Sequence, residues 1–181
     1  DNVTFTFKSI SSIRAKDEYS GYRISLTANY PPMSVPLKLD ITTGDKITPR
    51  EITYDFKLLL EDRTIQILSY NLETVMSEKI ETVITRGDQN TRPRDFYDIY
   101  ILHKLQGSNI DYSNLSKALQ ETAKKRHSEE IIKDHKEIIS VIQNSDIMNK
   151  RWKDYQKDFS YAQNIDFQST LLTLIEIMNI I

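Results

Sequence analysis

Three charged residues interrupt an otherwise regular pattern and are the first candidates for chemistry. Lys79 lies seven residues after Leu72, on a stripe where hydrophobic residues recur at helical spacing. An ammonium group at such a position either reaches past the edge of the core or faces a phosphate or a carboxylate. Asp95 and Asp98 are spaced i, i+3 on the next predicted helix, so both project from one side of it. They are the natural partners for Lys79, either in a structural ion pair or in a catalytic site.

A fourth candidate, Asp40, lies on a predicted strand. Its side chain is expected on the face opposite the apolar residues of that strand, shortly before a turn at Gly44. A single carboxylate on a strand is usually a solvated residue. Metal-assisted phosphoryl transfer needs several carboxylates to hold Mg²⁺ against triphosphate oxygens. Asp40 is therefore a candidate metal ligand if other carboxylates converge on it.

Basic residues cluster locally, although 24 Lys+Arg against 26 Asp+Glu leave a net charge of only -2. The link between the two charged helices is flanked by three arginines, which are candidates for nucleotide or RNA binding: Arg86, Arg92 and Arg94. Further along, the basic residues of 150–157 are interleaved with Trp152, Tyr155 and Phe159. That mixture suits stacking and phosphate contact with RNA. A solvated helix face with its aromatic residues in the core explains it at least as well.

Composition excludes several classes of protein. Because the chain has no cysteine, it has no disulfide scaffold, thiolate zinc site or cysteine nucleophile. Its four glycines are far apart, so neither GxGxxG nor GxxxxGK occurs, and the three histidines lack the spacing of a zinc hydrolase. No apolar run reaches about 18 residues, and no signal peptide is recognisable, so we expect a cytoplasmic protein without a membrane span.

The two halves of the 181-residue chain have different periodicity. Apolar residues alternate with polar ones, as in half-buried strands, over 3–8, 22–29, 37–42 and, more weakly, 64–68. From residue 70 the period becomes 3.6. We predict helices over 72–84, from about 91 to Gly107, and over 112–126, 128–143, 147–161 and 168–180. The expected fold class is α+β, with a sheet part over 1–68 and a helical bundle over 69–181.

Asn71 and Gly87 mark the ends of the first predicted helix. Asn71 is a suitable N-cap, and Gly87 a suitable C-terminal stop. Pro93 falls in the first turn of the second helix, where its missing N–H costs nothing, and Asp95 lies close to the positive end of the helix dipole. These local signals place Lys79 in the middle of one helix and both aspartates near the start of the next.

The segments that carry the candidates resemble the AbiEii/AbiGii toxin family, which comprises nucleotidyltransferase-like toxins of type IV abortive-infection toxin–antitoxin systems. The similar segments are 35–45, 68–80 and 90–100. The most specific part is Glu78-Lys79 followed by the stretch from Arg92 to Asp98. The resemblance extends from the first residues to about Leu105 and then weakens into a helical tail.

This resemblance implies a polymerase-β-like nucleotidyltransferase sheet followed by helices. Members are expected to transfer nucleotides from an NTP, with Mg²⁺, to an RNA acceptor, for which tRNA is a candidate. A cognate antitoxin and a role in phage defence are implied as well. By motif, Lys79 matches the lysine expected to contact nucleotide phosphates, and Asp95 matches the acidic residue that follows, with Asp98 close behind. Asp40 matches the strand carboxylate that completes the acidic, metal-binding site.

One family motif is not found in this sequence. It is a Gly-Gly-Ser/Thr loop followed by an Asp-x-Asp pair, which binds the triphosphate and supplies most of the metal ligands. We therefore expect the chain as given to be a truncated fragment that lacks transferase activity by itself.

Two other functions remain open at this point. One is a non-catalytic helical module that binds an antitoxin or RNA, for which an exposed apolar helix at residues 171–181 would be a suitable surface. The other is an unrelated α+β domain in which Lys79 and the aspartates form only a structural ion-pair network.

Overall fold

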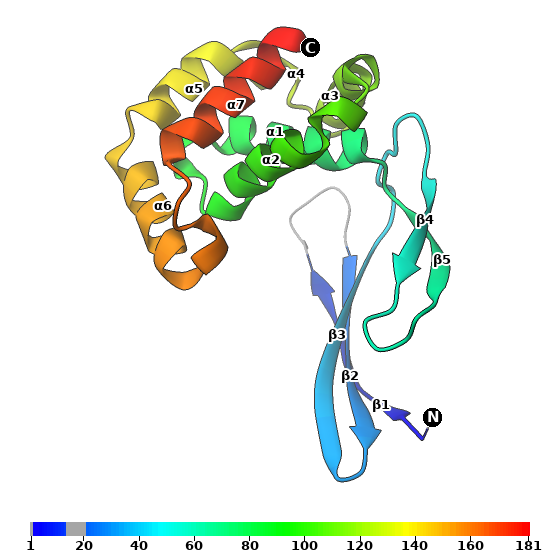
Figure 1. Cartoon of the computed structure of the whole chain (residues 1–181). Coiled ribbons are helices and arrows are strands. Elements are labelled where there is room, and N and C mark those ends of the chain that lie inside the picture. Colours follow the sequence, from blue (N-terminus) through cyan, green and yellow to red (C-terminus); the bar gives the residue numbers. More distant parts are fainter. Residues whose placement is uncertain (1, 14–20) are drawn as a thin grey trace. The chain divides into compact units, whose positions relative to one another are not determined.

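The computed structural model describes residues 2–13 and 21–181, which form two compact units (Figure 1). The first unit is Asp1–Asp45 and the second is Lys46–Ile181. Strands occupy the first unit and the beginning of the second, and helices follow from Leu72 onward. The predicted α+β class, with a sheet part followed by helices, is confirmed. The change from strands to helices falls between Ser69 and Leu72, whereas the compact units divide between Asp45 and Lys46.

The first unit is a three-stranded antiparallel sheet. Its strands are β1 (Thr4–Ile13), β2 (Gly21–Tyr30) and β3 (Met33–Thr42), and they lie in the order β1-β2-β3. The predicted alternation places one apolar row across all three strands, since Leu26 pairs with Phe7 on one side and Leu37 on the other. The opposite face is polar, because the same register pairs Arg23 with Asp40.

The second unit begins with a hairpin of β4 (Ile52–Lys57) and β5 (Thr64–Ser69). The sequence analysis predicted only the second of these strands. The first strand has the same period of two, since Ile52, Tyr54 and Phe56 alternate with polar residues. This pattern was sufficient to predict β4.

Seven α-helices and three short 3-10 segments complete the described part of the chain. The α-helices are α1 (Leu72–Arg86), α2 (Pro93–Gln106), α3 (Tyr112–Lys125), α4 (Glu129–Lys133), α5 (His135–Gln143), α6 (Asp146–Asp158) and α7 (Phe167–Ile180). The 3-10 segments are η1 (Gly87–Gln89), η2 (Gly107–Asn109) and η3 (Ser160–Ala162).

The helices share one core, in which Ile80 of α1, Phe96 of α2 and Leu174 of α7 are almost completely buried. Burial of these apolar faces is the main source of stability for the bundle.

The predicted ends of α1 are confirmed. The Asn71 side chain accepts a hydrogen bond from the Thr74 N–H at 2.8 Å, as an N-cap does. Its amide also donates to the carbonyls of Thr48 and Arg50, both at 2.8 Å, so the cap ties α1 to the segment before β4. Gly87 has a φ of 52°, and its N–H closes the last turn onto Val83 and Ile84.

One prediction about the later helices was wrong. The single helix predicted over 128–143 is two helices, because the chain turns at Asp134. There the His135 ring lies 3.0 Å from the carbonyl oxygen of Ile132, which gives that carbonyl a side-chain partner. The apolar segment 171–181 buries Leu171, Leu174 and Ile177 in the core, whereas Leu172 and Ile180 are 60% and 51% exposed. The segment therefore serves mainly as part of the core, and its role as a docking helix stays a prediction. None of the described helices is long and apolar enough to cross a membrane.

Candidate functional site

Lys79, Asp95 and Asp98 meet where α1 and α2 lie side by side in the bundle (Figure 1). The Lys79 Nζ atom is 3.2 Å from Asp95 Oδ1 and 2.6 Å from Asp98 Oδ2. The side chains are 23%, 14% and 19% exposed, respectively, so the group is largely buried but remains open to solvent. The i, i+3 spacing explains why both carboxylates reach one ammonium. We call these three residues the lysine–aspartate cluster.

The position of Lys79 follows from the packing of α1. Met76, Ile80 and Val83 are fully buried, and Lys79 lies at the edge of their stripe, where its ammonium reaches α2 instead of the core. Asp95 belongs to the first turn of α2, where the helix dipole favours a carboxylate. Local helix geometry is therefore sufficient to assemble the cluster.

The cluster retains unused hydrogen-bonding capacity. An ammonium has three donors, and Lys79 has two carboxylate partners among the described residues, so one N–H remains unused there. Asp95 Oδ2 is buried and has no hydrogen-bond partner within the described part of the chain. A buried carboxylate oxygen without a partner is rare in a structural ion pair and calls for a further polar partner, such as a water molecule. This feature distinguishes the cluster from a fully satisfied salt bridge.

Arg94 adds a second positive charge beside the cluster. Its Nε atom is 3.8 Å from Asp98 Oδ2, and its side chain is 73% exposed. With Lys79 and Arg94 against two carboxylates, the formal charge of the group is zero. A phosphate that approaches from solvent therefore meets two cations and no net repulsion.

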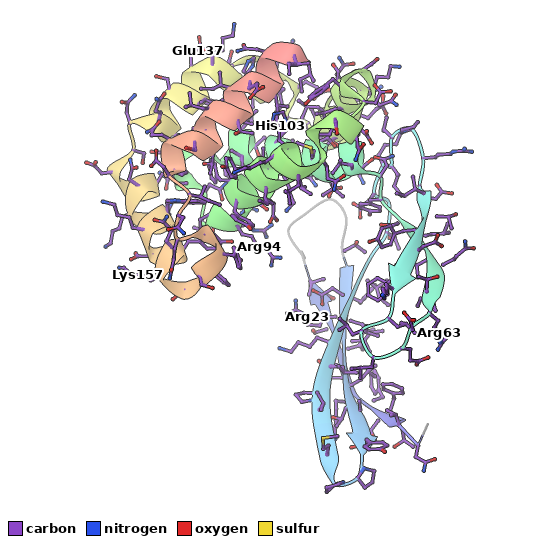
Figure 2. All side chains as sticks on the ribbon, viewed as in Figure 1. Arg23, Arg63, Arg94, His103, Glu137 and Lys157 are labelled. Carbon is purple, nitrogen blue, oxygen red and sulfur yellow. The ribbon has the colours of Figure 1, made fainter. Side chains whose placement is uncertain are left out.

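The three candidate arginines lie at the predicted place, around the α1–α2 link. Arg86 is in the last turn of α1, Arg92 immediately precedes α2, and Arg94 is in its first turn (Figure 2). All three are exposed. The structure brings Arg94 to the lysine–aspartate cluster, while the roles of all three in nucleotide or RNA binding stay predictions.

Arg151 of α6 holds the α1–α2 link, a role that the sequence analysis did not predict. Its Nη1 atom donates to the carbonyl oxygens of Asp88 at 3.0 Å and Asn90 at 2.9 Å. The Asn90 side chain in turn accepts from the Arg92 N–H at 2.7 Å. These contacts satisfy carbonyls that the helices leave free and fix the start of α2. Since the partners lie more than 60 residues apart, no local pattern reveals them.

The aromatic residues of the basic segment divide into two groups. Trp152 and Tyr155 are buried in the core, so for them the structural explanation was correct. Phe159 is 39% exposed, and its neighbour Tyr161 is 49% exposed. Burial raises the pKa of Tyr155 far above its ordinary value, and its bond to Tyr161 and the charge of Asp98 act in the same direction.

Asp40 lies in the first unit, on β3. Both of its carboxylate oxygens accept hydrogen bonds from Arg23, at 2.6 Å from Nε and 2.7 Å from Nη2. This bidentate pair is exposed and joins neighbouring strands. A cation on Asp40 would have to displace the guanidinium.

The described residues do not fit a magnesium site by themselves. No group of three or more His, Asp or Glu side chains suited to a metal occurs among residues 2–13 and 21–181. Asp40 is bound by Arg23, and the two aspartates of α2 share an ammonium. Asp40 as a metal ligand and Mg²⁺ as a cofactor therefore stay predictions.

Comparison with known proteins gives one family and one solved structure. The family model described as "Nucleotidyl transferase AbiEii toxin, Type IV TA system" matches residues 1–172. This match extends beyond Leu105 into the helical part. A crystal structure of a candidate nucleotidyltransferase from H. pylori aligns with 17% identity and a TM-score of 0.44. The alignment covers 97% of this chain and 65% of that chain, so this chain spans less than two thirds of the H. pylori protein. No curated protein gives a significant match.

Proposed function

This chain belongs to the AbiEii family of nucleotidyl transferase toxins of type IV toxin–antitoxin systems, and on that premise we propose that it takes part in transferring a nucleotide from a nucleoside triphosphate to an RNA acceptor. The candidate acceptor is tRNA. In this step an RNA hydroxyl oxygen bonds to the α-phosphorus, the bond from that phosphorus to the β-bridging oxygen breaks, and pyrophosphate leaves. The hydroxyl proton passes to water. Negative charge grows on the departing pyrophosphate, so the site must supply positive charge there.

The observation that carries this proposal is the partly exposed Lys79 ammonium with one N–H unused. Lys79 is the proposed catalytic residue, and its free donor binds a triphosphate oxygen. A compact ammonium suits this task because it acts as a point charge that is already held in place. Asp95 and Asp98 are positioning residues, since they hold the ammonium at 3.2 and 2.6 Å.

The arginines support binding of a polyanion next to this lysine. Arg94 lies beside Asp98, and Arg86 and Arg92 are exposed at the ends of the same link. Arginine binds phosphate with two parallel N–H donors, which favours an RNA backbone as its partner. Asp40 is a proposed ligand of Mg²⁺, which would balance triphosphate charge when bound. The toxin–antitoxin family implies a cognate antitoxin as a protein partner.

A labelling experiment tests this function. Protein expressed from its complete reading frame is incubated with radiolabelled NTPs, Mg²⁺ and total tRNA. We expect label in RNA with wild type and at least a hundredfold less with Lys79→Ala, because a preorganised charge at the leaving group is lost. The matched control is Lys133→Ala, which removes an exposed lysine of α4 paired only with Glu130 among the described residues.

The same experiment separates the catalytic role from a structural one. Thermal unfolding of both variants reports whether the bundle remains folded. Equal labelling by wild type and Lys79→Ala would remove Lys79 from the mechanism. Absence of any label in RNA with the wild type would overturn the proposed function.

A further inference from the structure

The exposed aromatic residues at the end of α6 lie on a rigid base. The Phe159 and Tyr161 rings are 5.5 Å apart, and both are partly open to solvent. Beneath them, the Tyr155 ring is 4.6 Å from Phe159, and the Tyr97 ring of α2 is 4.7 Å from Tyr161. We call Phe159 and Tyr161 the aromatic platform. Two neighbouring exposed rings that pack against the buried Tyr155 and the half-buried Tyr97 are a ready surface for another flat ring.

Hydrogen bonds hold the platform in place before any ligand arrives. The Tyr155 and Tyr161 hydroxyls lie 2.9 Å apart and bond to each other. The Gln156 amide donates to the carbonyls of Ala162, Gln163 and Ile165 at 2.9 to 3.1 Å, and so fixes the turn after Tyr161. Because these side chains are already ordered, a ligand that stacks on them loses little of its binding energy to ordering the protein.

The platform adjoins the lysine–aspartate cluster. Tyr97, which supports Tyr161, is the residue before Asp98 on α2, and Asp98 binds Lys79. The Tyr97 ring also lies 6.4 Å from the Tyr155 ring, so α2 and α6 pack together at the base of the platform. A ligand on the platform is therefore near the proposed site of phosphate binding.

The surrounding charge indicates a nucleic acid rather than an apolar ligand. Arg94 is exposed at the start of α2, and Lys157 is exposed on α6 two residues before Phe159 (Figure 2). Cations beside stacked aromatic rings are typical of surfaces that bind single-stranded RNA. Lys150 and Lys153 of α6 are exposed as well. This number of cations suits a strand with several phosphates better than a single nucleotide.

We propose that the platform of Phe159 and Tyr161 stacks a nucleobase at the single-stranded 3′ end of the RNA acceptor, with Arg94 binding a phosphate of the same strand. This inference rests on the proposed function. The platform offers ring faces, and the hydroxyl of Tyr161 is already bonded to that of Tyr155 beneath it. It therefore binds all four bases with similar affinity.

A fluorescence titration of the 181-residue chain tests the proposal without requiring catalysis. The probe is a short single-stranded RNA whose 3′-terminal base is 2-aminopurine, because its fluorescence is quenched when the base stacks. We expect saturable quenching by wild type. In the double variant Phe159→Leu, Tyr161→Leu, which keeps apolar side chains but removes both rings, we expect about tenfold weaker binding and little quenching.

Three controls make the result specific. Tyr54→Leu removes a tyrosine of β4 that is 51% exposed, as a match for Tyr161, and it should leave quenching unchanged. The conservative variant Tyr161→Phe keeps the ring and should retain quenching. Circular dichroism and thermal unfolding check that each variant is folded.

The outcomes distinguish this proposal from the proposed function. Unchanged quenching and affinity in the double variant would overturn the platform, whether or not the complete protein transfers nucleotides. Quenching of 2-aminopurine riboside triphosphate but not of the RNA would overturn the assignment to the acceptor. Lys79→Ala, in contrast, should abolish transfer and retain quenching, because it leaves both rings in place.

Discussion

The ammonium nitrogen of Lys79 lies 2.6 Å from Oδ2 of Asp98, the shorter of its two bonds to α2. The same carboxylate oxygen is 3.8 Å from Arg94 Nε. Asp98 therefore joins the lysine proposed to bind the triphosphate to the arginine proposed to bind RNA. Both ends of the proposed reaction depend on one side chain.

Asp98→Asn tests this dependence. The amide keeps the size of the side chain but loses the charge that holds Lys79, so we expect transfer to fall at least tenfold. The free energy of unfolding should fall by about 1–3 kcal/mol, since a hydrogen bond to a charged group is weakened in a largely buried place. Transfer assays and urea unfolding measure the two effects. The control Asp154→Asn removes an exposed partner of Lys157 and should leave the free energy of unfolding nearly unchanged. Full transfer by Asp98→Asn would show that Lys79 does not need this partner.

Arg151→Gln tests the anchoring of the α1–α2 link. The loss of two charge-assisted bonds to the carbonyls of Asp88 and Asn90 should lower the free energy of unfolding by about 1–3 kcal/mol. Amide hydrogen exchange of residues 87–92 should accelerate, because the link opens more easily. Lys150→Gln, on the same helix but exposed, is the matched control. Unchanged exchange in Arg151→Gln would mean that the link is held by the helices alone.

Because of Tyr155, the free energy of unfolding should decrease at alkaline pH. Its pKa in the folded protein lies above the value of about 10 expected in the unfolded chain, chiefly because of burial. A raised folded pKa gives stability that is complete below pH 10 and is lost as pH rises from there toward the folded pKa. Urea unfolding between pH 8 and 11 should show this decline in the wild type. The decline should be smaller in Tyr155→Phe, and equal slopes would assign the pH dependence to other groups.

Substitution of Asp40 tests whether this residue binds Mg²⁺. If Mg²⁺ binds there in the complete protein, chelation with EDTA abolishes transfer, and Asp40→Asn raises the Mg²⁺ concentration needed for half-maximal rate. Removal of this exposed pair with Arg23 should change the free energy of unfolding little. Arg23→Gln is the matched variant, and it should lower the required Mg²⁺ concentration because it frees Asp40 of its guanidinium. A Mg²⁺ dependence identical in both variants and the wild type would exclude Asp40 as a ligand.

Local periodicity was sufficient to predict the lysine–aspartate cluster. The stripe of α1, the caps at Asn71 and Gly87 and the spacing of Asp95 and Asp98 are all set within a few residues. A short link between two helices makes them neighbours, so their charged residues face each other with little freedom. The same reasoning predicted the α+β class and most strands and helices.

Other features were decided by contacts between distant residues. Trp152 and Tyr155 are buried whereas Phe159 and Tyr161 are exposed, although all four belong to one aromatic and basic segment. Arg151 belongs to the basic segment for which RNA contact and a solvated helix face were both open, yet it holds a link some 60 residues away. Asp40 meets Arg23 only through the register of two strands. The sequence alone thus determined which side chains share a helix face or a strand face, because backbone geometry sets those periods. Only the tertiary structure decided which faces are covered, because burial depends on which elements pack together across the chain.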